Sequence, residues 1–235
     1  MTLQKETETP KDSPKDAHGK WYADACGTAF AMELVGERWS MLIIRELMLG
    51  GRRFSDIRAS LPGISAKVLS ERLVTLEQAG VLVRRKLPPP AASQVYELTE
   101  WGYLAEPAIQ ELGRWAAHSP AHDATLPLSP VSFMLSLRTM INKTCARYFD
   151  GVIGFETGGE SFVGRLAAGQ LPIERGDTAG ADTVFRASTP MELAALFYGK
   201  VPPGEWERAE GRTIEGDRSL ARLFLDLFSL PEKVG

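Results

Sequence analysis

Residues 54–80 read FSDIRASLPGISAKVLSERLVTLEQAG and decide the fold of the first half of the chain. Ser55 and Ser65 each predict the start of a helix, because a serine hydroxyl accepts hydrogen bonds from the free N–H groups of a first helical turn. Segment 61–64 (LPGI) predicts a turn, since proline and glycine interrupt helices. Gly80 suits the left-handed position that follows a last helical turn. Two helices joined by a short glycine-containing turn form a helix-turn-helix.

Two strand-like segments follow the helix-turn-helix. Residues 81–87 (VLVRRKL) and 94–98 (QVYEL) carry the β-branched and aromatic side chains that favour strands. Residues 88–93 (PPPAAS) must form the loop between them, because proline cannot donate a backbone hydrogen bond. A hairpin directly after a helix-turn-helix makes the motif a winged helix, which reads DNA and is not an enzyme.

More helices flank the motif. Residues 27–35 and 39–49 carry apolar side chains at helical spacing, and each segment runs into a glycine. Thr99 predicts the start of a further helix over residues 100–118, and Pro107 is expected to kink that helix. These helices extend the winged helix on both of its sides.

Composition divides the chain into four segments. Residues 1–20 are polar and charged, and we expect them to be disordered. Residues 21–118 are expected to form the winged-helix DNA-binding domain, and the proline-rich residues 119–130 a linker. Residues 131–235 alternate helical and strand-like segments, so the fold class is α+β. The expected helices there are 133–148, 191–198 and 219–228, and the expected strands are 152–155, 161–166, 171–174 and 183–187.

Overall composition and charge narrow the function. The sequence has no run of about 18 apolar residues, so we expect no membrane span. Only two cysteines, Cys26 and Cys145, are present, which fits a reducing cytoplasm. The formal net charge is −3, yet residues 36–86 hold ten basic side chains against five acidic ones. A basic block in an acidic protein marks the place where a polyanion can bind.

The second helix of the motif has two faces. Leu69, Leu73 and Leu76 fall on one side and would hold the helix against the core. Side chains near its N-terminus would face the major groove, where lysine can reach guanine acceptors or a phosphate. The expected major-groove set is Ser65, Ala66, Lys67, Ser70, Glu71 and Arg72. Phosphate contacts, which position a protein without reading sequence, are expected from Arg52, Arg53, Arg84, Arg85 and Lys86.

A longer pattern surrounds the motif. It comprises Cys26 and segments 33–47 (ELVGERWSMLIIREL), 51–58 (GRRFSDIR), 61–73 (LPGISAKVLSERL), 76–80 (LEQAG) and 96–99 (YELT). This pattern, nearly gapless over about residues 26–117, resembles the HxlR family of bacterial winged-helix regulators. The resemblance implies homodimers that bind palindromic operators in double-stranded DNA. It also implies dimer contacts from the first helix and from the helix that starts at Glu100.

The wing departs from that pattern. Relatives in the HxlR family often carry an arginine just before the second wing strand, where this chain has Ser93 and Gln94. A wing-tip contact in the minor groove is therefore not expected to carry over.

The second half of the chain has a looser resemblance. Segments 181–188 (ADTVFRAS), 193–199 (LAALFYG) and 211–217 (GRTIEGD), followed by an amphipathic helix, resemble the sterol-carrier-protein-like fold from about Tyr148 onward. That resemblance implies a sheet covered by helices around an apolar tunnel for hydrophobic molecules. A purely dimerising domain is the alternative. The side chains expected to line the tunnel, or else to form ordinary core, are Phe133, Leu137, Met140, Phe197, Phe224, Leu227 and Phe228.

Cys26 is a second candidate for sensing a signal. In some members of the HxlR family a cysteine at this place senses oxidants or electrophiles, and a thiolate is favoured near a helix N-terminus. The alternative is an inert packed thiol. Cys145 lies on an apolar helix and is expected in the core.

Enzyme functions have little support in the sequence. Gly158-Gly159 indicates a turn, and no glycine-rich phosphate loop with a lysine is present. Pro120 separates His118 from His122, so a helical metal pair is not expected. We therefore expect no catalytic residue, no metal and no cofactor.

The sequence as a whole indicates a cytoplasmic, dimeric repressor whose affinity for DNA changes when a small hydrophobic ligand binds. Two alternatives stay open: a redox or electrophile sensor acting through Cys26, and a lipid-binding or transfer protein with a vestigial DNA-binding domain.

Overall fold

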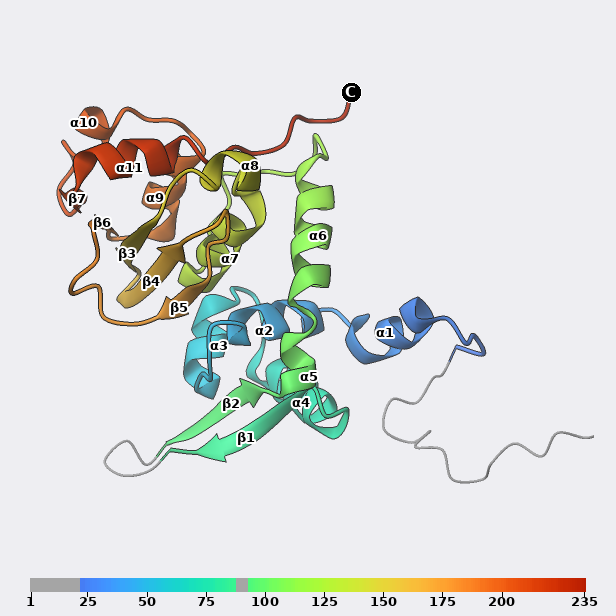
Figure 1. Ribbon diagram of the computed structural model, residues 1–235. Helices are drawn as coiled ribbons and strands as arrows, with labels where there is room; N and C mark the ends of the chain where they lie inside the picture. The colour runs from blue at the N-terminus through green and yellow to red at the C-terminus, as the bar shows by residue number, and fades with distance from the viewer. Residues whose placement is uncertain (1–21, 88–92) are drawn as a thin grey trace, which may run out of the picture.

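The computed structural model describes residues 22–87 and 93–235, in two units that lie side by side (Figure 1). The N-terminal unit is a group of helices from which a two-stranded sheet projects, and the C-terminal unit packs helices on a five-stranded sheet. The predicted disordered tail, residues 1–20, and most of the predicted wing loop lie outside the described residues. Within those ranges no helix has the length and apolar character needed to cross a membrane.

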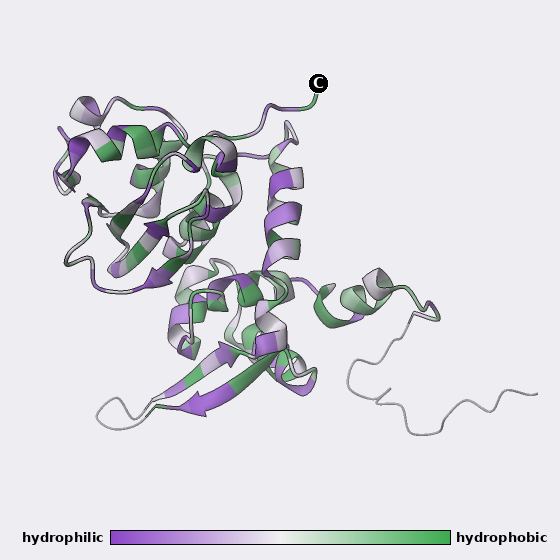
Figure 2. Cartoon of the chain, viewed as in Figure 1, coloured by the Kyte–Doolittle hydropathy of each residue, from purple (hydrophilic) through white to green (hydrophobic). Residues whose placement is uncertain are grey.

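The N-terminal unit is a winged helix, as the sequence predicts. Its elements are α1 (Gly27–Val35), α2 (Ser40–Leu47), α3 (Phe54–Ser60), α4 (Ala66–Gln78), β1 (Leu82–Lys86), β2 (Gln94–Leu98), α5 (Glu100–Tyr103) and α6 (Glu106–Ala117). Helices α3 and α4 form the helix-turn-helix, and the antiparallel pair β1–β2 forms the wing. Strand β1 is mostly hydrophilic (Figure 2). Ile44, Leu47 and Leu69 have no exposed surface and lie in the shared core that holds α4 on α2.

Of the two serines expected to cap the motif helices, Ser65 caps its helix and Ser55 does not. The Ser65 hydroxyl accepts a hydrogen bond from the Val68 N–H at 3.2 Å, and Gly80 has a φ of 72°, both as predicted. Ser55, however, is not a cap. Helix α3 begins one residue earlier, at Phe54, and the Ser55 hydroxyl donates to Asp56 Oδ1 at 3.0 Å.

The single kinked helix expected over residues 100–118 is two helices. Helix α5 ends at Tyr103, and Pro107 lies in the first turn of α6. A proline fits there because its missing N–H would have no helical partner in any case. The chain between the helices closes with tight turns, in which the N–H groups of Leu104 and Ala105 donate to the carbonyls three residues before them.

The C-terminal unit has one mixed sheet in the order β5-β4-β3-β6-β7, with β3 and β6 parallel. Its elements are α7 (Pro130–Met140), α8 (Lys143–Ala146), β3 (Gly151–Thr157), β4 (Glu160–Leu166), β5 (Ile173–Arg175), β6 (Thr183–Ala187), α9 (Pro190–Phe197), α10 (Pro203–Trp206), β7 (Thr213–Gly216) and α11 (Arg218–Leu225). The expected helix over residues 133–148 ends at Met140, because Asn142 caps α8 and its own N–H donates to Leu227 O at 2.8 Å. Helix α10 and strand β7 are not among the elements expected from the sequence.

The two units meet along α6 and α7. Arg138 of α7 forms an ion pair with Glu106 of α6 at 2.8 Å. The last residues of the chain also return to the end of α6: the Val234 N–H donates to His118 O at 2.9 Å, and Lys233 Nζ donates to Ala117 O at 2.9 Å.

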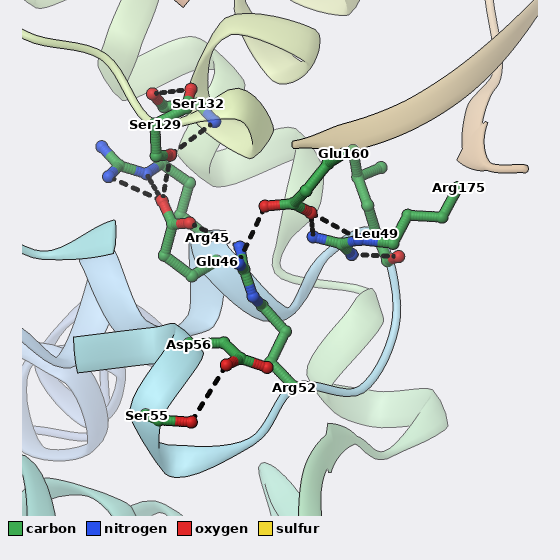
Figure 3. A network of polar contacts seen from close by, with 10 residues as sticks. All are labelled: Arg45, Glu46, Leu49, Arg52, Ser55, Asp56, Ser129, Ser132, Glu160 and Arg175. Carbon is green, nitrogen blue, oxygen red and sulfur yellow. Dashed lines mark hydrogen bonds and ion pairs between the residues drawn. The ribbon is translucent and has the colours of Figure 1, made fainter. Parts of the chain in front are cut away.

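A buried carboxylate lies at this junction (Figure 3). Glu46 of α2 has no exposed surface. Its carboxylate accepts hydrogen bonds from Arg45 Nη2 at 2.9 Å, Arg52 Nη1 at 3.2 Å and the Ser129 hydroxyl at 2.7 Å. Ser129 also caps α7, because its hydroxyl accepts from the Ser132 N–H at 3.0 Å. One carboxylate thus joins α2 to the start of α7.

The network continues into the C-terminal sheet. Arg52 Nη2 donates to Glu160 of β4 at 2.9 Å, so its guanidinium bridges two carboxylates. Arg175 of β5 donates from Nε to Glu160 at 2.9 Å and from Nη1 to Leu49 O at 2.7 Å. Charged side chains from both units therefore complete one another's hydrogen bonds.

Glu46→Ala should destabilise the chain by about 3–5 kcal/mol, because it leaves the buried Arg52 with one carboxylate partner instead of two. The control Glu77→Ala breaks a more exposed pair with Arg84 and should cost under about 1 kcal/mol. Urea unfolding followed by tryptophan fluorescence measures both. Shifts of similar small size in the two variants would contradict the structural role given to Glu46.

Candidate DNA interface

The N-terminal part of α4 presents polar side chains to solvent. Lys67 is 86% exposed, and Ser65, Ser70 and Glu71 are also exposed. Leu69, Leu73 and Leu76 on the opposite side are buried, as the sequence predicts. A rigid helix with a buried apolar side and an exposed polar N-terminal side is the geometry that enters a major groove.

Two other expected major-groove residues, Ala66 and Arg72, are only partly exposed. Arg72 has a side chain that is 20% exposed and forms an ion pair with Glu37 at 3.6 Å. Its guanidinium therefore ties α4 to the turn before α2. Lys67 lies 4.0 Å from Glu71 one turn later, a loose contact that leaves its ammonium group available to DNA.

The wing carries exposed cations that are held by neighbouring carboxylates. Arg84 pairs with Glu77 of α4, which raises the pKa of its guanidinium through a hydrogen bond and charge attraction. Arg85 pairs with Glu97 on β2 at 2.9 Å. Successive strand residues point to opposite faces, so Arg84 and Arg85 serve different sides of the wing. These pairs hold the arginines at the surface, where phosphates can compete for them.

Three more exposed cations surround the motif. Arg53 precedes α3, and its Nε donates at 3.2 Å to the hydroxyl of Ser93, which immediately precedes β2 at the loop end of the wing. Lys86 at the end of β1, part of the basic run 84–86 from which phosphate contacts are expected, is exposed as well. Arg58 on α3 is also exposed and does not belong to the contact set expected from the sequence.

Arg52 does not belong to this surface, so the phosphate contact expected from it is corrected. The residue is 8% exposed. Its N–H donates to Tyr96 O at 2.9 Å and its carbonyl accepts from the Tyr96 N–H at 2.8 Å, which places it beside β2. Its side chain then turns inward to Glu46 and Glu160.

Most of the side chains expected to line an apolar tunnel are buried in a packed core instead, and Met140 is half-buried at its edge. The rings of Phe224 and Phe228 are 4.9 Å apart, and those of Phe197 and Phe228 are 5.3 Å apart, which is direct aromatic packing. Within the described part of the chain none of the expected lining residues borders the surface cavities of about 810 and 390 Å³. Those residues are Phe133, Leu137, Met140, Phe197, Phe224, Leu227 and Phe228.

The two cysteines are both exposed, so the core position expected for Cys145 is wrong. Cys26 stands at the cap position of α1. The N–H of Thr28, with smaller contributions from the Thr28 hydroxyl and the Ala29 N–H, lowers the pKa of the Cys26 thiol below its usual value. Hydrogen bonds of this kind favour the thiolate.

Similarity to known proteins falls on the N-terminal unit. A family model described as HxlR-like helix-turn-helix matches residues 34–123. The chain is 41% identical over 86 residues to the uncharacterized HTH-type transcriptional regulator YvaP of Bacillus subtilis, an alignment covering 80% of that protein and 37% of this chain. It is 43% identical over 86 residues to the HTH-type transcriptional regulator YodB of the same organism, covering 77% of that protein and 37% of this chain.

Among solved structures, the reduced form of YodB from B. subtilis aligns over its whole chain and 43% of this one, at 38% identity and a TM-score of 0.38. The family follows from the relatives, which are matched at more than 40% identity over most of their own length. With a winged helix in the structure as well, this chain belongs to the HxlR-like helix-turn-helix family of DNA-binding transcriptional regulators.

Proposed function

We propose that the protein is a dimeric repressor that binds a palindromic operator, with one α4 helix in the major groove of each half-site. The observation that supports this most directly is the exposed N-terminal side of α4, with Lys67 at its centre and the opposite side buried. Half-sites about one DNA turn apart would suit a symmetric dimer.

Base reading is assigned to Lys67, Ser70 and Glu71, with Ser65 and Ala66 closest to the helix start. Phosphate binding is assigned to Arg53, Arg84 and Arg85, which ring the motif at the surface. Contacts of the second kind add affinity for any DNA and depend strongly on salt.

The dimer surface is proposed on α1, α5 and α6. No residue of α1 is buried, and Met32 on it is 42% exposed. On α5 and α6, Trp101 is 47% exposed, Leu112 48% and Trp115 74%. Large apolar side chains gathered on neighbouring helices mark an interaction surface in a folded protein. Figure 1 shows α1 standing away from the body of the chain, as a helix does when its partner is another subunit.

The C-terminal unit is proposed to have the sterol-carrier-like fold and to receive an effector. We propose residues 21–118 and 131–235 as the two domains of the chain, with 119–130 as the linker. Packing of α9 and α11 on β6 supports the fold. The filled phenylalanine core weighs against a lipid-transfer function, because a lipid would first have to displace those rings.

A second candidate function is thiol sensing through Cys26. The residue is exposed, has a lowered thiol pKa and lies at the start of α1, on the proposed dimer surface. Oxidation or alkylation there would change the contacts of α1, and through them the spacing of the two α4 helices.

Lys67→Ala should weaken binding to an operator recovered by in vitro selection by about 1–3 kcal/mol, because it removes a base or phosphate contact in the major groove. Arg85→Ala should weaken binding to operator and random DNA alike and reduce the salt slope by about 1. Fluorescence anisotropy titrations at several salt concentrations measure both, with Arg165→Ala as a surface control on β4. If Lys67→Ala and Arg165→Ala behave alike, α4 does not read the operator as proposed.

Trp115→Glu should convert the dimer to a monomer, because a buried carboxylate without a partner opposes association. Leu223→Glu, at a 44% exposed position on α11, is the matched control and should leave the dimer intact. Analytical ultracentrifugation gives the oligomeric state of each. A dimeric Trp115→Glu protein would place the subunit contact elsewhere.

Cys145→Ser leaves Cys26 as the sole thiol, and its alkylation by iodoacetamide should reach half its maximal rate at a lower pH than that of a free cysteine. The direction follows from the lowered pKa, which increases the thiolate fraction at neutral pH. Operator affinity should then change on alkylation, whereas Cys26→Ser should not respond. Unchanged affinity of the alkylated Cys145→Ser protein would remove the sensing function from Cys26.

A further inference from the structure

A groove of about 810 Å³ lies where the two units meet. Its walls come from α2, from α3 and the turn after it, from the segment before α7, and from β4 and β5. Cavities that hold small molecules have volumes of about 300–1,000 Å³ and often lie between domains. We call it the interface groove and define it by Trp39, Leu42, Arg45, Pro62, Leu128 and Arg175.

One wall of the groove is a strip along α2. Leu42 and Arg45 lie three residues apart on α2 and share a face of the helix, and Trp39 stands at the cap position just before it. The strip therefore follows the start of the helix. It offers an aromatic ring, then an aliphatic side chain that is 37% exposed, then a guanidinium. Leu128 and its neighbouring prolines supply a second apolar wall.

The arginines that line the groove differ in how many of their N–H groups already have hydrogen-bond partners. Arg52 and Arg175 each donate to Glu160 and to one further acceptor. Arg45 donates to Glu46 from Nε and Nη2 only. Its Nη1 has no partner among the described residues and can pair with a new acceptor, whereas Arg175 Nη2 lacks a hydrogen bond but already lies 2.7 Å from a carboxylate oxygen of Glu160.

The acidic side chains of the groove set the charge of the ligand. Glu160 is neutralised by two arginines. Asp56 also borders the groove and has only the Ser55 hydroxyl as a side-chain partner among the described residues, so its charge opposes a second negative group. A ligand with a single carboxylate fits this arrangement better than a dianion.

Trp39 connects the groove to the DNA-reading helix. It has a φ of 81°, a left-handed conformation that strains a bulky side chain and that proteins often keep at functional positions. Its ring lies over Gly63, in the turn that precedes α4. A molecule resting on this ring therefore touches the segment that sets where α4 begins.

We propose that the interface groove binds a small aromatic monocarboxylic acid, with its rings on Trp39 and Leu42 and its carboxylate on Arg45 Nη1. Glu160 of β4 and Arg175 of β5 wall the same groove from the C-terminal unit, so a ligand bound there lies against both units. It therefore changes their relative placement and with it the operator affinity. The effect on DNA rests on the proposed regulator function, whereas binding of the acid does not.

Isothermal titration of the full chain with 2-naphthoate, 2-naphthylmethanol and 2-naphthylmethylammonium tests the site. Naphthoate should bind, and the alcohol and the cation should bind at least about tenfold more weakly, since they forgo a charge-assisted hydrogen bond. Ala59→Trp, which fills the groove, should abolish binding, whereas Ala121→Trp on the exposed linker should not. Arg45→Gln should make the acid and the alcohol bind alike.

Absence of naphthoate binding, or equal binding of the three probes, overturns the proposal. The proposal is also overturned if a folded Ala59→Trp protein binds naphthoate as well as the unchanged chain does and Arg45→Gln still prefers the acid over the alcohol. Anisotropy titrations with and without saturating naphthoate test the effector role, which an unchanged operator affinity overturns. Failure of the unliganded chain to prefer operator over random DNA would instead contradict the proposed function and leave the acid site standing.

Discussion

The Glu46 carboxylate is the interaction on which the arrangement of the two units depends. A charge without exposed surface is tolerated only when several donors surround it, and here the donors come from α2, from the segment before α3 and from the segment before α7. Arg52 then carries the network to Glu160 on β4. The winged helix and the C-terminal sheet are therefore held by directional polar contacts, which accept few relative placements, and not by apolar packing alone.

Local sequence signals predicted the motif well, because its caps and turns are decided within a few residues. Ser65 and Gly80 adopt the conformations that their side chains favour. The cap predicted at Ser55 was wrong, because Ser55 is the second residue of α3 and its hydroxyl donates to the neighbouring Asp56. Pro107 is a similar case. A proline indicates that a helix is interrupted, but it fits both a kink within one helix and the first turn of a new helix, so the sequence did not distinguish the two.

The sequence predicted which side chains of the candidate DNA interface are exposed. It did not predict which side chains pair with residues that are distant in the sequence. Helical spacing separates Lys67 from Leu69, since one side of α4 must face the core. The spacing cannot show that Arg52 meets Glu160, which is 108 residues away. In the C-terminal unit, apolar side chains such as Phe197 and Phe224 occur at the same intervals in a filled core as in the wall of a tunnel. Only their contacts distinguish the two.

The return of the C-terminal residues to the end of α6 has a mechanical consequence. Lys233 and Val234 satisfy carbonyls at the last turn of that helix, so α6 is clamped at its far end by the tail and braced at its start by Arg138 of α7. A helix held at both ends resists bending and moves as one rigid body. A rotation of the C-terminal sheet therefore displaces the whole of α6, together with the apolar side chains on its surface.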